Sequence, residues 1–183
     1  MDTNKLLACC ALWLGTMVSG FAQEPPTGVT RVEEQHAMLR SSDPKLAANK
    51  KLVYDMYRAI VQGGRYEQAE KFFTKGYIQH NPNVASGRDE LVKFIRNSRP
   101  QRQVQPGLTF PLISIVAEGD MVMVATATWE QDLEKPGERY ATTHFDLYRI
   151  ENGLIAEHWD HVPKSSGART FDPNSILETA PKK

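Results

Sequence analysis

The side chains best suited to proton transfer lie near the C-terminal end of the chain, in two segments that alternate polar and apolar residues. His144 and Asp146 belong to the first segment, and His158 and Asp160 to the second. Because strand side chains alternate between faces, the four would share one face of a sheet if the segments pair in the register that a three-residue turn gives. A carboxylate beside an imidazole fixes its tautomer and raises its basicity, as a general acid or base near neutral pH requires.

The turn at residues 151–153 sets how these two strands pair. A three-residue Glu-Asn-Gly loop places Asp146 opposite His158 and His144 opposite Asp160. A two-residue Asn-Gly turn shifts the register by one residue and removes both pairs. We favour the first register because it brings opposite charge types together. Such pairs can simply pin a sheet through buried hydrogen bonds, but two of them beside the hydroxyl of a tyrosine favour a functional pocket.

A second polar run follows a short helical segment at Tyr77-Ile78-Gln79-His80-Asn81-Pro82. It is typical of an extended segment entering a turn, and Asn-Pro by itself is also common in surface loops. If His80 points inward, it brings a third imidazole toward the face that carries the first two.

Helical spacing in the first half of the chain gives way to strand spacing in the second. Asp43-Pro44 begins a helix with one apolar stripe, which Gly63-Gly64 ends. A short helix spans 66–73, and a third opens at a capping box of Ser86 and Asp89. Strands follow over 108–117, 121–130, 140–150 and 154–162. The order predicts an α+β domain, with about three helices packed on a curved four-stranded antiparallel sheet.

The ends of the 183-residue chain predict an exported protein. An apolar run at 6–18, followed by Gly20-Phe21-Ala22, is typical of a signal peptide over 1–22. Leu6-Leu7-Ala8-Cys9 resembles a lipoprotein cleavage box but precedes the apolar run, so we expect no stable membrane anchor after cleavage. A flexible leader over 23–42, a domain over 43–164 and a flexible tail over 165–183 would follow.

Charge and cysteine content exclude several classes of protein. The 22 basic and 22 acidic residues balance, which argues against a nucleic-acid partner. Both cysteines, Cys9 and Cys10, fall in the predicted signal peptide. The mature chain would therefore contain no disulfide, thiolate metal site or cysteine nucleophile.

Three runs together resemble a known family: the run from Tyr77 to Pro82, Asp146-Leu147-Tyr148-Arg149, and Gly153-Leu154-Ile155-Ala156-Glu157-His158-Trp159-Asp160. They are similar to the SnoaL-like proteins, and more narrowly to the group predicted to catalyse aldol condensation, over about residues 50–162. The resemblance implies the nuclear transport factor 2-like cone and acid–base chemistry on a carbonyl compound without a cofactor. It also implies catalytic roles for four residues, which are His80, Asp146, His158 and Asp160.

This sequence departs from the family pattern at Tyr148, where phenylalanine is usual, and in the His161-Val162-Pro163 run that follows the Trp-Asp pair. His144 looks like an addition. The expected pocket also contains Tyr77 and Asn81, and either of these or Tyr148 could stabilise an enolate oxygen. Substrate and exact chemistry do not follow from the pattern.

Three functions remain open from the sequence. The first is a cofactor-free cyclase, isomerase or lyase, and the second is a protein that binds a small apolar ligand without turnover. The third is a metal site made by His80, His144, His158 and a carboxylate. An apolar stripe on the opposite sheet face further predicts a homodimer, through Phe145, Leu147, Ile155 and Trp159.

Overall fold

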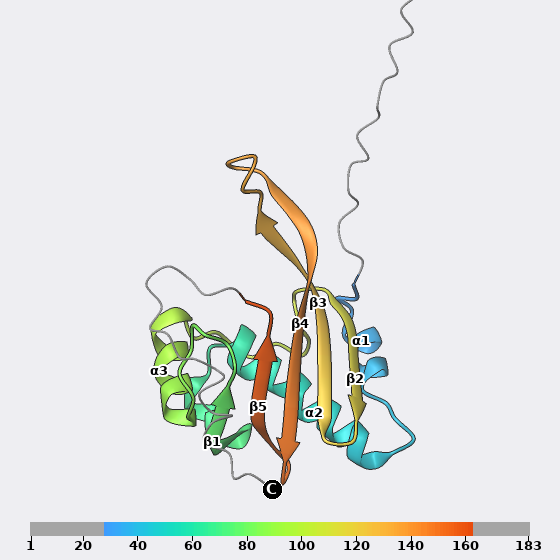
Figure 1. The fold of residues 1–183 in the computed structure, drawn as a ribbon. Coiled ribbons are helices and arrows are strands. Elements are labelled where there is room, and N and C mark those ends of the chain that lie inside the picture. The colour runs from blue at the N-terminus through green and yellow to red at the C-terminus, as the bar shows by residue number, and fades with distance from the viewer. Residues whose placement is uncertain (1–27, 163–183) are drawn as a thin grey trace, which may run out of the picture.

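The computed structural model describes residues 28–162 (Figure 1). The predicted signal peptide, the first residues of the predicted leader and the predicted tail over 165–183 lie outside the described residues. Within residues 28–162, no helix is long and apolar enough to cross a membrane.

A single five-stranded sheet carries the fold, in the spatial order β1-β5-β4-β3-β2. All neighbours are antiparallel except β1 and β5, which are parallel. The strands are β1 (Phe73–Gln79), β2 (Leu112–Glu118), β3 (Met121–Gln131), β4 (Arg139–Glu151) and β5 (Leu154–Asp160). The four strands expected in the second half of the chain are thereby confirmed, and the α+β class with them.

The helices supply the second layer, and the apolar core lies between them and the sheet. They are α1 (Val32–Met38), α2 (Pro44–Met56), the π-helical turn η1 (Tyr57–Gln62), the 3-10 helix η2 (Tyr66–Lys71) and α3 (Arg88–Ser98). The Asp43 side chain accepts hydrogen bonds from the backbone N–H groups of Lys45 and Leu46, which confirms the predicted helix start. Gly63 follows η1, as expected of a residue that ends a helix.

The sequence did not reveal β1. We read its residues as the end of a helix and an extended turn, so the predicted sheet was one strand short. The partner of β1 is β5, about eighty positions later, with Gln79 paired to His158. Two parallel strands are not joined by a hairpin turn, so no turn motif in the sequence predicts that they pair.

The predicted flexible leader is wrong where the structure describes it. Residues 32–38 form α1, and Gln35 is fully buried. Its amide oxygen accepts from the Tyr54 hydroxyl at 2.6 Å and from the Leu108 backbone N–H at 2.9 Å. Its amide nitrogen donates to the Leu108 carbonyl oxygen at 2.9 Å. A polar side chain thus docks this short helix, which leaves no apolar periodicity for sequence analysis to detect.

The predicted capping box of the third helix is also wrong. Gly87, with a φ of 102°, precedes α3 and makes no side-chain cap. The Ser86 hydroxyl instead accepts a hydrogen bond of 3.0 Å from the Gln79 backbone N–H. It therefore ties this loop to the end of β1.

The β4–β5 hairpin corrects the predicted register. Asn152 and Gly153 both have positive φ angles, 51° and 76°, and form a two-residue turn that pairs Glu151 with Leu154. A bulge in β5 then adds a second one-residue shift, so that Asp146 lies opposite Asp160 rather than His158. Two shifts together restore the parity, and the residues that we placed on one face do share it.

The outer face of the sheet carries an apolar row and is uncovered by the described helices, since α2 passes behind the sheet in Figure 1. Val116, Met123, Leu147 and Trp159 are paired in succession across four strands. Phe145 lies beside this row and is 48% exposed. Ile155, which we had assigned to this face, is fully buried in the core because the bulge turns it inward.

We propose that the outer face pairs two copies of the chain, because an exposed apolar row of this length usually meets a partner. Light scattering at micromolar concentration should give the mass of a dimer. Met123→Glu should give a monomer because it places a charge in the row, whereas Lys45→Glu, at an exposed site on α2, should leave the dimer intact. A wild-type monomer would contradict the proposal.

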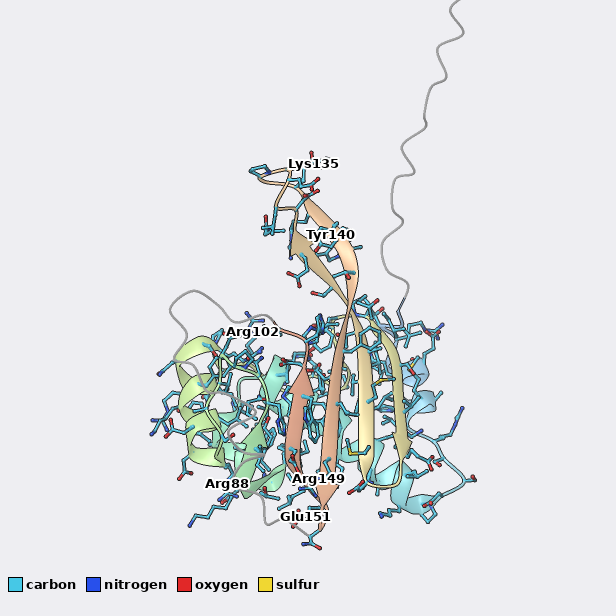
Figure 2. The ribbon with its side chains drawn as sticks, in the orientation of Figure 1. Arg88, Arg102, Lys135, Tyr140, Arg149 and Glu151 are labelled. Atoms are coloured by element: carbon cyan, nitrogen blue, oxygen red, sulfur yellow. The ribbon has the colours of Figure 1, made fainter. Side chains whose placement is uncertain are left out.

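Beyond the body of the sheet, β3 and β4 continue together as a projecting arm (Figure 1). Tyr140 lies on this arm and Lys135 at its tip, at the opposite end of the molecule from Arg149 and Glu151 (Figure 2). The long β3–β4 ladder runs without a register shift from the Met121–Arg149 pair to the Gln131–Arg139 pair. This continuity fixes which β4 side chains face the helices.

Candidate functional site

A cavity of about 430 Å³ lies between the helices and the inner face of the sheet. This is the size range of pockets that hold a small organic molecule. Seven of the eight predicted site residues line it: Tyr77, Asn81, His144, Asp146, Tyr148, His158 and Asp160. The remaining wall is largely apolar and comes from α2, η1, α3 and the loop before β2. The cavity thus has a polar floor, formed by the sheet, and largely apolar sides.

His158 and Asp146 form the closest histidine–aspartate contact of the site. The distance between His158 Nε2 and Asp146 Oδ1 is 2.7 Å, and both residues are buried. The predicted contact is therefore present, although the two residues are diagonal neighbours rather than directly opposed. A carboxylate only accepts hydrogen bonds when ionised, so His158 Nε2 is the donor in this contact.

Asp146 also receives hydrogen bonds from two other side chains. His144 Nε2 lies 3.3 Å from the same Oδ1 atom, and the Tyr57 hydroxyl donates to Oδ2. Sequence analysis missed Tyr57, whose position in the apolar stripe of α2 and η1 is typical of a core residue. No sequence signal distinguishes it, because the π-helical turn that begins at Tyr57 is seen only in the folded chain.

The hydrogen bonds decide the charge of Asp146. Burial alone would raise the pKa of its carboxyl group, but the donors on His144, His158 and Tyr57 reverse that effect. They hold the pKa well below its usual range, so the carboxylate is charged at neutral pH. In return, the hydrogen bond to Asp146 raises the pKa of His144.

Three buried phenols surround this carboxylate. Burial is the main cause that raises the pKa of all three phenols well above 10.0. The negative charge of Asp146 adds to this effect for Tyr57 and Tyr148, and that of Asp160 adds to it for Tyr77. Each phenol therefore stays protonated and can act only as a neutral hydrogen-bond donor. The Tyr148 hydroxyl donates to that of Tyr57 at 3.3 Å, and the Tyr148 ring stacks on His158 with centroids 4.5 Å apart.

Tyr77 differs from the other two phenols. It is 1% exposed and lines the cavity, and its hydroxyl makes no hydrogen bond to any residue between 28 and 162. Its ring packs edge-on against Phe73 with centroids 4.9 Å apart. Because Tyr77 lines the cavity, its hydroxyl is a donor available to a bound ligand.

The second predicted pair, His144 with Asp160, does not form. His144 contacts Asp146 instead, because the corrected register moves Asp160 opposite Asp146. Asp160 accepts from Asn81 Nδ2 at 2.7 Å and from the Val162 backbone N–H at 3.2 Å. Asn81 is thereby fixed at the cavity wall with its amide donor already engaged.

His80 lies outside the cavity. Its ring stacks on Trp159, with centroids 4.4 Å apart and an angle of 5° between the planes. Its Nε2 atom lies 2.9 Å from Glu157 Oε2, and Arg149 Nε donates to the other oxygen of Glu157 at 2.6 Å. The condition that His80 points inward is therefore not met, and the catalytic role that the resemblance implied for His80 loses its basis. The end of β1 lies beside β5 so that this imidazole faces the outer side of the sheet.

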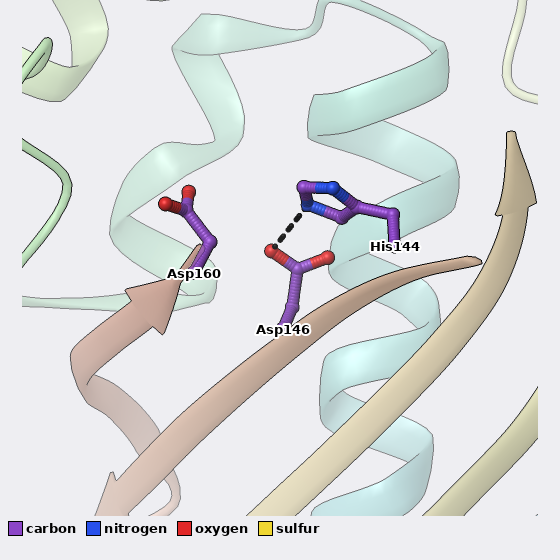
Figure 3. A group of neighbouring side chains, drawn as sticks. All are labelled: His144, Asp146 and Asp160. Atoms are coloured by element: carbon purple, nitrogen blue, oxygen red, sulfur yellow. Dashed lines mark hydrogen bonds and ion pairs between the residues drawn. The ribbon is translucent and has the colours of Figure 1, made fainter. Parts of the chain in front are cut away.

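The predicted metal set is not assembled, because His80 is separated from the other histidines. Among residues 28–162, His144, Asp146 and Asp160 are grouped with ligand atoms within 4.8 Å of one another (Figure 3). Such donors could hold a divalent metal. In this structure both carboxylates already accept hydrogen bonds from protein donors, which accounts for their proximity without an ion.

The raised pKa of His144 predicts a pH effect with a defined sign. The stabilisation from its contact with Asp146 is fully present below pH ~6.5, the unfolded pKa, and is lost as the pH rises through the folded pKa. NMR titration of the His144 ring should give a pKa above 6.5. Asp146→Asn should lower it, because the hydrogen bond to the charged carboxylate is the main cause of the shift. An unchanged value in the variant would contradict this reading.

Comparison with known proteins agrees with this architecture. The sequence matches the SnoaL-like domain family over residues 53–158, more than half of its 183 residues. No functionally curated protein shows significant similarity to the sequence.

Several solved structures are similar in shape. TsrD from Streptomyces laurentii is 24% identical, with 66% of this chain and 90% of that chain covered and a TM-score of 0.45. A nuclear transport factor 2-like protein of unknown function from Burkholderia pseudomallei is 15% identical, with 72% and 95% covered and a TM-score of 0.45. An epoxide hydrolase from M. tuberculosis, of the LEH-like type, is 13% identical, with 64% and 84% covered and a TM-score of 0.47.

The family match covers the chain from the last turn of α2 to His158 in β5, and therefore includes β1 to β4, most of β5 and the His158–Asp146 contact. This chain therefore belongs to the SnoaL-like domain family.

Proposed function

We propose that this protein is an enzyme that removes a proton from a carbon atom next to a carbonyl group, inside the enclosed cavity. The observation that carries the proposal is the 2.7 Å contact between His158 and a charged, buried Asp146. The chemistry uses side chains alone and leads to isomerisation or to aldol-type bond formation, as in a cyclase or lyase.

His158 is the proposed general base. Its Nε2 proton is held by Asp146, so the Nδ1 lone pair is left to accept the substrate proton. Proton uptake turns the imidazole into a cation, which the adjacent carboxylate stabilises. The stack of the His158 ring on Tyr148 further limits rotation, so that the base keeps one orientation.

Tyr77 is the proposed donor to the enolate oxygen. Sequence analysis left Tyr77, Tyr148 and Asn81 as alternatives for this role. In the folded chain Tyr148 donates to Tyr57 and Asn81 donates to Asp160, whereas the Tyr77 hydroxyl has no partner among residues 28–162. A donor held in a water-poor site is most effective where negative charge develops in the transition state.

His144 completes the proposed cycle. It shares the Asp146 carboxylate with His158 and has a raised pKa, so it is the group better suited to return a proton to the substrate. Asp160 then acts as a positioning residue that holds Asn81 rather than as a proton carrier.

Hydrogen–deuterium exchange tests the proposal without knowledge of the natural substrate. Alkyl aryl ketones incubated with the protein in D₂O should gain deuterium next to the carbonyl, faster than in buffer alone and in proportion to protein concentration. Mass spectrometry measures the gain. His158→Ala should remove the effect of the protein.

The alternative is a binding protein without turnover, which the apolar cavity walls would also suit. In that case ketones would shift the unfolding temperature of the protein but exchange no faster than in buffer. That result, or exchange that His158→Ala leaves unchanged, would overturn the proposed enzyme.

A further inference from the structure

We propose that the substrate carries a carboxylate group and that Arg99 binds it at the mouth of the cavity. This inference rests on the proposed function, whose substrate class it narrows. The observation behind it is a fixed guanidinium group that lines the cavity without an acidic partner in the described part of the chain.

Arg99 is held at both its backbone and its side chain. Its backbone N–H donates to the Ile95 carbonyl oxygen at 2.9 Å, and its Nη1 atom donates to the Val61 carbonyl oxygen at 2.8 Å. The residue precedes Pro100, which restricts its backbone to the extended conformation that it adopts. Gly64, at a φ of 60°, packs against Pro100 so closely that a side chain at this position would clash. The chain thus builds a defined position for this arginine.

Its charge is not balanced within the site. Four other arginines form ion pairs with glutamate or aspartate: Arg31, Arg58, Arg65 and Arg149. Arg99 forms none with residues 28–162, although partial desolvation lowers the pKa of its guanidinium group. Neither aspartate of the cavity forms an ion pair with Arg99: Asp146 accepts from His158, and Asp160 accepts from Asn81. An anion from outside the chain would therefore be favoured here.

The remaining donors of the guanidinium group suit a carboxylate. With Nη1 bonded to Val61, the Nε and Nη2 atoms are left as one edge, and their parallel N–H groups match the two oxygens of a planar carboxylate. The aromatic side chain of Phe94, also at the cavity wall and 39% exposed, adds an apolar surface for the neighbouring part of the ligand.

Tyr148 connects this subsite to the proposed base. It lines the same cavity as Arg99, and its ring stacks on that of His158. A substrate that reaches both would bind its carboxylate on one side of Tyr148 and present its reacting carbon on the other. The carboxylate is thus expected to be separated from the carbonyl group by at least one carbon atom.

Calorimetry with one matched ligand pair tests the inference. The ligands are 4-oxo-4-phenylbutanoate and its methyl ester, which differ in charge but little in shape. The wild-type protein should bind the acid about 10- to 100-fold more tightly than the ester, as expected for a charge-assisted pair. Arg99→Gln should bring the ratio close to one, and Arg99→Lys should retain part of it.

Arg102→Gln is the control, since this arginine lies at the surface outside the cavity (Figure 2). It should leave the preference for the acid unchanged, and circular dichroism should show that all variants are folded. Equal binding of acid and ester by the wild type, or an unchanged ratio in folded Arg99→Gln, would overturn the inference.

These experiments test the proposed enzyme activity and the carboxylate site at Arg99 independently of each other. His158→Ala should abolish deuterium exchange while keeping the preference for the acid. Exchange without any acid preference would overturn the Arg99 inference alone, whereas acid preference without exchange would overturn the proposed enzyme alone.

Discussion

Asp146→Asn is expected to lower the rate of deuterium exchange by a factor of roughly 10² to 10⁴, the range typical of general acid–base groups. An asparagine has nearly the same shape but can turn its NH₂ group toward His158. The imidazole would then carry its proton on Nδ1, the atom proposed to act as the base, and the charge that stabilises the imidazolium cation would be lost. His158→Ala should be about as damaging, and the double variant should add little because the pair acts as a unit.

The control for this prediction is Glu157→Gln. Glu157 lies on β5, and this variant makes the same acid-to-amide change next to a histidine. The histidine here is His80, which faces the outer side of the sheet. Exchange rates should remain close to those of the wild type. If Asp146→Asn and Glu157→Gln lowered the rate of deuterium exchange equally, both residues would act only through the stability of the sheet. The proposed mechanism would then have to be abandoned.

Tyr77→Phe should reduce kcat for exchange by a factor of roughly 10² to 10³, the cost of losing one donor to a developing oxyanion. KM should change little, because the hydrogen bond strengthens mainly in the transition state. Thermal unfolding should be almost unaffected, since the hydroxyl has no partner among residues 28–162 whose loss would cost stability.

Tyr54→Phe provides the comparison for this second prediction. Tyr54 is equally buried, but its hydroxyl donates to Gln35 and it does not line the cavity. It should lose stability, by about 1 kcal/mol or more, and keep its kcat. Tyr77→Phe with normal kcat and lowered stability would assign Tyr77 a structural role instead.

Much of the site could be predicted because strand alternation is a local property. Alternation places His144, Asp146 and Tyr148 on one face of β4, and His158 with Asp160 on one face of β5. That these two faces coincide depends on the register between the strands. The family-like runs then added Tyr77 and Asn81, and both line the cavity.

The pairing within that face could not be predicted, because it depends on energies that the sequence pattern does not display. A two-residue Asn-Gly turn and a bulge in β5 each move the register by one residue. The two shifts together keep the histidines and aspartates on one face, but they place Asp160 instead of His158 directly opposite Asp146. A bulge is set by packing on both sides of a strand, and neither side is visible in a single sequence.

The sequence by itself therefore determined the fold class, the boundaries of β2 to β5 to within a few residues, and the alternation of side chains within β4 and within most of β5. The tertiary structure alone decided that His80 faces outward, that α1 docks through Gln35, and that Tyr57 and Arg99 join the site. These four placements depend on contacts between residues far apart in the chain: β1 with β5, α1 with the loop before β2, η1 with β4, and the end of α3 with η1. Long-range contacts depend on the packing of the whole core, and the spacing of residues within a short segment does not predict them.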